Sequence, residues 1–261
     1  MFEAYWGLQR GPFSEQSARQ SLATSPTHGE ALARLDFLRE SCCRLGLLLG
    51  PAGSGKSLVV QEFARRAERA GARAIVVPAA AADGEGLLGD IATGLGASGI
   101  TSTAGQWRAV ADRLAEIALE EVTAVVAIDD LDRATADGQA VVERLLALCD
   151  VPLTIVGTAR TESARRISRP ILEQVALRID LAPWNEDETR AYLQSSLSQA
   201  GRNQPAFDDR AVRRLFELSG GAPRKVNQLA QLALLAGAGQ NLLQVDAATI
   251  DGVEEELSVG R

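Results

Sequence analysis

Residues Gly50–Ser57 have the types and the spacing needed to bind a phosphate group. They match the phosphate-binding loop (P-loop) pattern G-x-x-x-x-G-K-[ST] at every required position. Glycines in such a loop allow successive backbone N–H groups to face a polyphosphate. Lys56 is expected to reach the β- and γ-phosphates, and the hydroxyl of Ser57 to bind Mg²⁺.

The segments on either side of this loop decide between a nucleotide site and a plain glycine-rich turn. Residues 45–49 form an apolar run that predicts a buried strand, and residues 57–70 predict a helix with one apolar side. Strand, glycine loop and helix in this order favour the nucleotide site. The residues expected to bind it are Gly50, Pro51, Ala52, Gly53, Ser54, Gly55, Lys56, Ser57 and Leu58.

Two acids follow another apolar segment. Residues 122–128 predict a strand, and Asp129 and Asp130 come directly after it. Asp129 is expected to hold Mg²⁺, and Asp130 to polarise the water that attacks the γ-phosphate. The alternative is that both acids only cap the following loop.

Three further residues could contact the nucleotide. Thr158 follows the predicted strand 153–157, where its hydroxyl could reach the γ-phosphate or serve only as a turn residue. Arg178, within the apolar segment 175–181, could act as an arginine finger on a neighbouring subunit or form a salt bridge within the chain. Arg224 opens a predicted helix, from which it could reach the phosphates or face solvent.

A basic cluster separates the last two predicted strands. It consists of Arg160, Arg165, Arg166 and Arg169. Such clusters are usually solvated, although this one could contact nucleic acid or an acidic partner. Arg166 and Arg169 are also alternatives to Arg178 as the arginine finger.

The elements that must position these residues alternate in type. Five predicted strands are separated by helices, which indicates an α/β fold with a parallel sheet covered on both faces. The strands lie at residues 45–49, 74–78, 122–128, 153–157 and 175–181. After Pro183 only helices are expected. We therefore predict two domains, an N-terminal segment with a P-loop core over residues 1–182 and a small helical lid over 183–261.

Composition narrows the class of protein. The chain is 46% hydrophobic and has a formal net charge of −7, which argues against coating nucleic acid by bulk electrostatics. Its cysteines, Cys42, Cys43 and Cys149, lack metal-site spacing, and its single histidine is His28. No signal peptide and no apolar run near the ~20 residues of a membrane span are seen. We expect a cytoplasmic protein.

An ordered set of motifs resembles the AAA+ ATPases of the ExeA/GspA type, named after general secretion pathway protein A. The resemblance covers almost the whole chain. Beside the P-loop it is carried by Tyr5-Trp-Gly-Leu8, Pro12-Phe13, Pro26-Thr-His28, Glu30-Ala-Leu32-Ala-Arg-Leu35, Val156-Gly157, Arg178-Ile179, Glu188-Thr189 and Ser219-Gly-Gly-Ala-Pro-Arg224-Lys-Val-Asn227.

The resemblance implies a five-stranded sheet of order 5-1-4-3-2, a helical lid, and ATP with Mg²⁺ bound between them. It also implies homo-oligomers with ATP sites between subunits. It assigns sensor 1 to Thr158, the arginine finger to Arg178 and sensor 2 to Arg224, and it places the segment around His28 near the adenine. Family members usually carry glutamate where this chain has Asp130, so slow turnover is expected.

These observations favour an ATPase that hydrolyses ATP to drive assembly or remodelling of a partner complex. The sequence does not identify the protein partner. Two alternatives stay open. One is an ATP-dependent regulator that assembles on DNA, as related ATPases of transposition do. The negative net charge of the chain argues against this alternative. The other is a nucleotide-binding scaffold with low turnover, which is motivated by Asp130.

Overall fold

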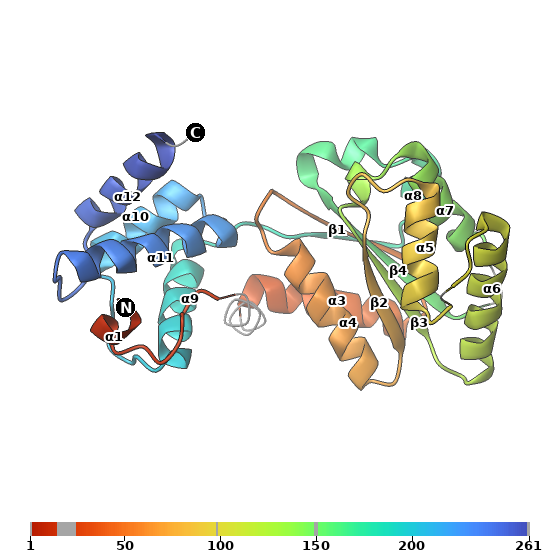
Figure 1. Cartoon of the computed structure of the whole chain (residues 1–261), viewed down its shortest axis with the longest axis horizontal. Coiled ribbons are helices and arrows are strands. Elements are labelled where there is room, and N and C mark those ends of the chain that lie inside the picture. The colour runs from red at the N-terminus through yellow and green to blue at the C-terminus, as the bar shows by residue number, and fades with distance from the viewer. Residues whose placement is uncertain (1, 15–24, 98, 149–150, 260–261) are drawn as a thin grey trace. The chain divides into compact units, whose positions relative to one another are not determined.

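The computed structural model describes residues 2–14, 25–97, 99–148 and 151–259 (Figure 1). Cys149 lies outside this described part. The chain divides into two compact units, which are considered separately. The sheet unit comprises Glu30–Pro51 and Lys56–Leu181, and the helical unit comprises Met1–Gly29, Ala52–Gly55 and Ala182–Arg261. The predicted lid thus shares its unit with the N-terminal segment and the tip of the P-loop.

Five parallel strands form the sheet, in the order β2-β3-β4-β1-β5, which confirms the expected order. They are β1 (Leu45–Gly50), β2 (Arg73–Pro78), β3 (Ala124–Asp129), β4 (Leu153–Arg160) and β5 (Leu177–Asp180). Gly50 lies beside Arg160, and Ile128 beside Gly157. The carboxyl ends of β3, β4 and β1 therefore share one edge of the sheet, where the predicted chemistry falls.

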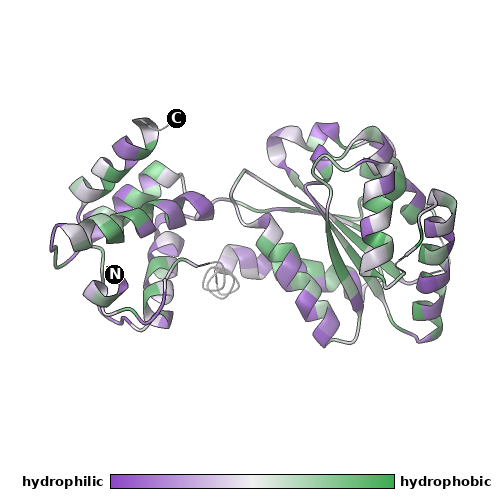
Figure 2. Ribbon diagram, in the orientation of Figure 1, coloured by the Kyte–Doolittle hydropathy of each residue, from purple (hydrophilic) through white to green (hydrophobic). Residues whose placement is uncertain are grey.

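Continuous apolar runs explain why the middle strands are buried on both faces (Figure 2). Leu47, Val126 and Ile155 pack on one face with side chains of α5 (Gly84–Gly94), α6 (Thr103–Leu119) and α7 (Ala136–Leu146). Helix α4 (Lys56–Arg69) contacts β2 and β3 and buries its apolar side, including Phe63.

Shorter elements complete the sheet unit. The 3₁₀ turns η1 (Leu131–Arg133) and η2 (Thr161–Arg166) follow β3 and β4, and the short helix α8 (Arg169–Leu172) precedes β5. Helix α3 (Pro26–Glu40) begins in the helical unit and continues into the sheet unit. Its apolar stripe, Leu32, Leu35 and Leu38, is buried as the helical spacing suggests.

The helical unit contains α1 (Phe2–Trp6), α9 (Glu186–Gln199), α10 (Asp209–Ser219), α11 (Pro223–Gly239) and α12 (Ala247–Val259). Asn185 and Glu188 form a reciprocal capping box at the start of α9, and Asp208 caps α10. Helix α1 was not expected, because five residues are too few to show a helical period. It is anchored by Trp6, whose Nε1–H donates to the Leu234 carbonyl at 2.8 Å.

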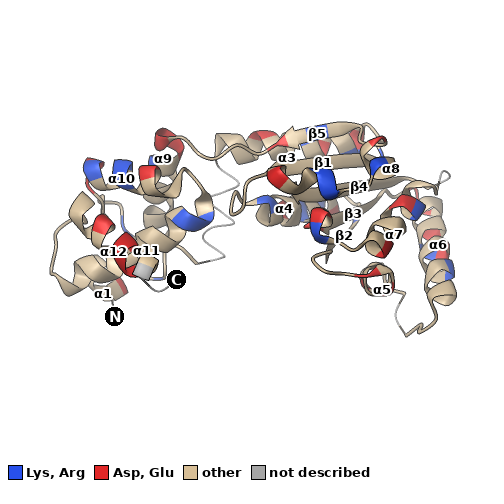
Figure 3. Cartoon of the chain, turned by 90° about the horizontal axis from the view of Figure 1, so that it is seen from above, with Lys and Arg blue, Asp and Glu red and all other residues tan. Residues whose placement is uncertain are grey.

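Charged residues lie mainly in the helices and loops of each unit (Figure 3). Within the described ranges, no helix combines the length and the apolar character needed to cross a membrane.

Candidate nucleotide site

The P-loop links the end of β1 at Gly50 to the start of α4 at Lys56. Between them, Gly53 and Gly55 have φ angles of 77° and 97°. Only glycine adopts this region without steric cost. The sequence pattern therefore corresponds to a backbone that needs glycine at these two positions.

Lys56 follows the loop in sequence, and its side chain reaches back to the beginning of the loop. Its side chain is buried, and Nζ donates hydrogen bonds to the carbonyls of Gly50 and Pro51, both at 2.9 Å. Burial lowers the pKa of Lys56, whereas the charges of Asp130 and Asp129 oppose this shift. Its ammonium thus lies in the field of the two acids that the sequence assigned to catalysis and metal binding.

Thr158 joins those two acids. Its Oγ1–H donates to Asp129 Oδ1 at 2.6 Å, and Oγ1 accepts the backbone N–H of Asp130 at 2.9 Å. Thr158 is fully buried on β4, next to β3. Three predicted site residues are therefore connected through the Thr158 hydroxyl at one sheet edge.

Asp130 has an unusual conformation for an aspartate. Its φ angle is 57°, in the left-handed region, at the junction between β3 and η1. Oδ2 accepts a hydrogen bond from Arg133 Nη1 at 3.0 Å, in a pair that is partly exposed. Sequence reasoning missed Arg133, although a basic residue three positions after an acid was a usable signal.

Asp132 is a second residue that sequence reasoning missed. Its side chain is 2% exposed, and Oδ2 accepts a hydrogen bond from the Ser163 hydroxyl. Its other oxygen, Oδ1, is buried without a hydrogen-bond partner among the described residues. Asp132 adds to the negative field at Lys56. The signal in the sequence was a third acid two positions after Asp130.

The helical unit brings Arg224 to the tip of the P-loop through its backbone. The N–H of Arg224, in the first turn of α11, donates to the Gly53 carbonyl at 3.2 Å. A Cβ on Gly53 would lie 3.1 Å from Arg224 Cβ, so glycine also permits this close approach. The Arg224 side chain is exposed.

His28 reaches the same tip through its ring. Its Nε2 lies 2.8 Å from the Ser54 carbonyl oxygen, and its Nδ1 lies 3.2 Å from Trp184 Nε1. The ring is 1% exposed, and burial lowers the pKa of His28. His28, Ser54, Gly53 and Arg224 thus form one contiguous group within the helical unit.

Arg178 has a partner within its own chain. On β5, its Nε and Nη2 donate to the two carboxylate oxygens of Asp180 at 3.0 and 2.9 Å. Both side chains are well exposed, so this is a surface ion pair. The intrachain salt bridge considered from the sequence is therefore present, and the arginine-finger role stays a prediction.

The basic cluster is only partly neutralised. Arg169 pairs with Glu173 at 2.8 Å, whereas no ion pair of Arg165 or Arg166 is found among the described residues. Both of these arginines are exposed in η2.

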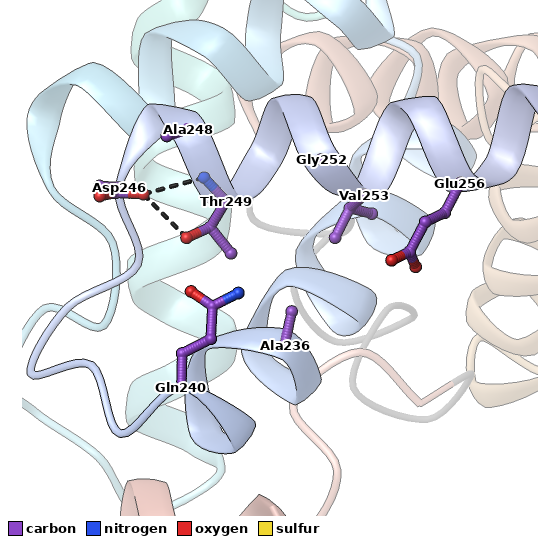
Figure 4. Close-up of a pocket in the computed structure, with 8 residues that line it drawn as sticks. All are labelled: Ala236, Gln240, Asp246, Ala248, Thr249, Gly252, Val253 and Glu256. Atoms are coloured by element: carbon purple, nitrogen blue, oxygen red, sulfur yellow. Dashed lines mark hydrogen bonds between the residues drawn. The ribbon is translucent and has the colours of Figure 1, made fainter.

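A hollow of about 310 Å³ lies between α11 and α12 in the helical unit (Figure 4). Gln240, Val253 and Glu256 are among the side chains that line it. Asp246 also borders it, but its carboxylate accepts hydrogen bonds from the N–H and hydroxyl of Thr249 and so caps α12. None of the predicted site residues lines this hollow.

Comparison with known families identifies the sheet unit. Residues 39–164 match the family model described as an AAA domain. This part of the chain is therefore similar to AAA domains. It is also 29% identical to general secretion pathway protein A of Aeromonas hydrophila over 262 aligned positions. This alignment covers 90% of the chain and 45% of that protein, so the chain spans about half of its length. The resemblance seen in the sequence is confirmed.

Solved structures share the fold. Cdc6p of Pyrobaculum aerophilum aligns with a TM-score of 0.74 at 14% identity, over 94% of this chain and 70% of that chain. The Orc1 protein of Aeropyrum pernix, in a complex with DNA, aligns with a TM-score of 0.68 at 18% identity, over 92% of this chain and 69% of that chain. The RuvB branch migration motor of Thermotoga maritima aligns with a TM-score of 0.59 at 16% identity, over 94% of this chain and 70% of that chain. These likenesses support the P-loop ATPase fold.

Proposed function

We propose that this chain binds ATP with Mg²⁺ and hydrolyses it to drive assembly or remodelling of a partner complex. The observation that carries the proposal is the connected group Asp129–Thr158–Asp130 at the sheet edge from which the P-loop leaves β1. A phosphate-binding loop and acids placed to hold Mg²⁺ and to orient water are the two parts that P-loop hydrolysis requires. In this proposal residues 1–182 form the ATPase core, residues 183–261 form the lid, and the setting is cytoplasmic.

The residues present fit a magnesium ion. Mg²⁺ prefers oxygen ligands and in nucleotide sites is held by one or two protein groups together with phosphates and water. The Ser57 hydroxyl and the second carboxylate oxygen of Asp129 would supply these groups, since Asp129 Oδ1 already accepts from Thr158. When bound, the ion would neutralise charge on the β- and γ-phosphates.

In the proposed reaction, Lys56 binds the terminal phosphates and stabilises the charge that develops on them. Asp130 orients the attacking water. To do so its carboxylate exchanges Arg133 for water, a modest cost because exposed ion pairs contribute only about 0–1 kcal/mol. Thr158 keeps its hydrogen bonds to Asp129 and to the backbone of Asp130 during the reaction, so it holds both acids in position.

Arg178 would act on the ATP site of a neighbouring subunit, so the proposed enzyme is a homo-oligomer. Its exposed position on β5 and its weak surface pairing with Asp180 support a side chain that can change partner. In related phosphoryl-transfer sites, an arginine supplied in trans contributes about 10³–10⁵ in rate. Arg224, at the first turn of α11, would report the state of the phosphates to the helical unit.

Complementation between two inactive variants tests this function. Phosphate release is measured over a range of protein concentrations for the wild type, Lys56→Ala, Arg178→Ala and an equal mixture of both variants. Each variant alone is expected to lose at least about hundredfold in rate. The mixture regains part of the rate, because some interfaces combine an intact Lys56 with an intact Arg178.

Arg34→Ala is the matched control, since it removes another exposed, ion-paired arginine of the same unit. It is expected to keep the wild-type rate. A wild-type rate per subunit that does not change with concentration, with no recovery in the mixture, would rule out the shared site. Absence of ATP binding by the wild type would rule out the function itself.

The pairing of Asp130 with Arg133 favours a second candidate, a nucleotide-binding scaffold with low turnover. In that case ATP binding fixes a conformation and hydrolysis is incidental. ATP-dependent assembly that persists in Asp130→Asn, with phosphate release in the wild type no faster than in this variant, would favour the scaffold over the motor.

A further inference from the structure

The partners of His28 define its tautomer. A carbonyl oxygen only accepts hydrogen bonds, so the Nε2 that lies 2.8 Å from the Ser54 oxygen carries the proton. An indole N–H only donates, so the Nδ1 that lies 3.2 Å from Trp184 Nε1 carries the lone pair. A neutral ring satisfies both contacts, and the lowered pKa of this buried histidine agrees with that state.

The bond to Ser54 also fixes the next peptide group of the P-loop. In a trans peptide the C=O and the following N–H lie in one plane and point in opposite directions. Because His28 holds the Ser54 carbonyl, the direction of the Gly55 N–H is set as well. Gly55, at φ 97°, has no side chain to restrict its backbone in any other way.

The preceding peptide is fixed in the same manner. The Arg224 N–H holds the Gly53 carbonyl at 3.2 Å, which orients the N–H of Ser54. Two consecutive peptide groups of the P-loop are thus held from outside the loop, one by a histidine ring and one by the first turn of α11. These are the backbone donors on which phosphate binding depends.

We propose that His28 is a positioning residue that turns the Ser54 carbonyl away from the phosphates and aims the Gly55 N–H at them; this rests on the ATP-binding function proposed above. His28 acts through the loop and does not read the adenine, because both ring nitrogens already have protein partners. The ligand group concerned is the polyphosphate.

A buried polar network fixes the ring itself. The Trp184 Nε1–H that faces His28 Nδ1 also reaches the Ser25 oxygen at 3.1 Å, and the Ser25 hydroxyl donates its one proton to Glu188 Oε1 at 3.2 Å. Glu188 Oε1 further accepts the N–H and the hydroxyl of Thr27 at 3.1 and 2.7 Å. Since Glu188 belongs to the capping box of α9, the ring is tied to the beginning of that helix.

Binding of two ligands separates a positioning role from an adenine contact. Dissociation constants for ATP and for inorganic tripolyphosphate are measured with the full chain, for the wild type, His28→Phe and His28→Gln. Phenylalanine removes both nitrogens, whereas the amide of glutamine places a donor near the Nε2 position. His28→Phe is expected to weaken both ligands by about tenfold, the effect of one charge-assisted hydrogen bond. His28→Gln recovers binding to within about threefold of the wild type.

Tyr5→Phe is the matched control, because it removes another single hydrogen bond from the N-terminal segment, the one to the Leu242 carbonyl. It leaves both constants unchanged. Loss of ATP binding without loss of tripolyphosphate binding would make His28 an adenine contact and overturn the proposal. Equal binding by His28→Phe and the wild type would also overturn it, while leaving the ATP-binding function intact.

A measurement without nucleotide tests the positioning directly. The amide resonance of Gly55 in the free chain is expected to shift in His28→Phe and to stay close to the wild-type value in His28→Gln. Thermal unfolding of each variant establishes that it is folded. A Gly55 resonance that does not respond to His28→Phe in a folded chain overturns the proposal, even if the wild type binds no ATP.

Discussion

The two ends of the proposed nucleotide site are built in different ways. At the acid end, the Thr158 hydroxyl on β4 directly holds Asp129, the last residue of β3, and the backbone of Asp130, which follows it. At the tip of the P-loop, the carbonyls of Gly53 and Ser54 are held by residues distant in sequence, Arg224 and His28. The first arrangement is fixed by the sheet. The second depends on the folding of the helical unit.

This difference separates two quantities that an ATPase must control. Groups that orient water and metal affect the rate of hydrolysis, whereas loop N–H groups that contact phosphates affect binding. Changes at the acid end should therefore act on kcat, and changes at the loop tip on the dissociation constant of ATP. The following predictions test this separation.

The largest effect is expected for Thr158→Val. The substitution leaves Asp129 Oδ1 and the Asp130 N–H without their shared partner, and each unpaired buried group costs about 1–3 kcal/mol. We expect kcat to fall by about tenfold to hundredfold while the affinity for ATP stays within about twofold. Steady-state phosphate release and equilibrium ATP binding measure the two quantities. Thr158→Ser, which keeps the hydroxyl, is the control, and a change in affinity alone would remove the distinction.

An intermediate effect is expected for Arg133→Gln. It releases the Asp130 carboxylate from an ion pair that contributes about 0–1 kcal/mol, so kcat should rise by up to about fivefold. Asp130→Glu tests the same point by extending the carboxylate by one methylene. Arg113→Gln removes an ion pair of the same i,i+3 spacing on α6 and should have no effect. A lower kcat in Arg133→Gln would show that the arginine assists the reaction.

The smallest effect is a pH dependence of stability that belongs to His28. Burial lowers its pKa in the folded chain, despite the opposing charge of Glu188 on α9, so the unfolded chain binds more protons at acidic pH. The free energy of unfolding should therefore fall as the pH drops below about 6.5, by less than about 1.4 kcal/mol per unit. The ring of Tyr192 lies beside that of Trp184. Burial raises the pKa of Tyr192 to about 12, so Tyr192 stays neutral over this pH range.

Urea unfolding of the wild type and of His28→Gln, from pH 7.5 to pH 5.5, isolates this contribution. The difference between the two chains should shrink as the pH falls, since only the wild type carries the histidine. A constant difference over the whole range would mean that His28 does not titrate in either state within it.

The sequence was sufficient for the sheet order and the P-loop because local signals determine both. Apolar runs predicted all five strands, and the glycine pattern predicted the loop that Gly53 and Gly55 require. The beginning of α9 is a local feature as well, since Asn185 and Glu188 form its capping box three residues apart. These features depend on neighbours within a few positions, which a single sequence displays directly.

The contacts that sequence reasoning missed are those between distant positions. Nothing near His28 indicates that its ring meets Ser54, and nothing near Thr158 indicates that it holds Asp129 and Asp130 together. Arg133 and Asp132 were overlooked for another reason, since they lie in a short 3₁₀ turn that has no periodic pattern. Their roles appear only once the strands are side by side.

The bond between Arg224 and Gly53 has a consequence for helix α11. The residue at its N-cap position, Ala222, has no side chain that can satisfy the free N–H groups of the first turn. The Gly53 carbonyl satisfies one of them, so the P-loop serves as part of the cap of this helix. Any rearrangement of the loop on filling or emptying of the site would therefore change how readily the first turn of α11 frays, and amide hydrogen exchange at Arg224 would follow the occupancy of the loop.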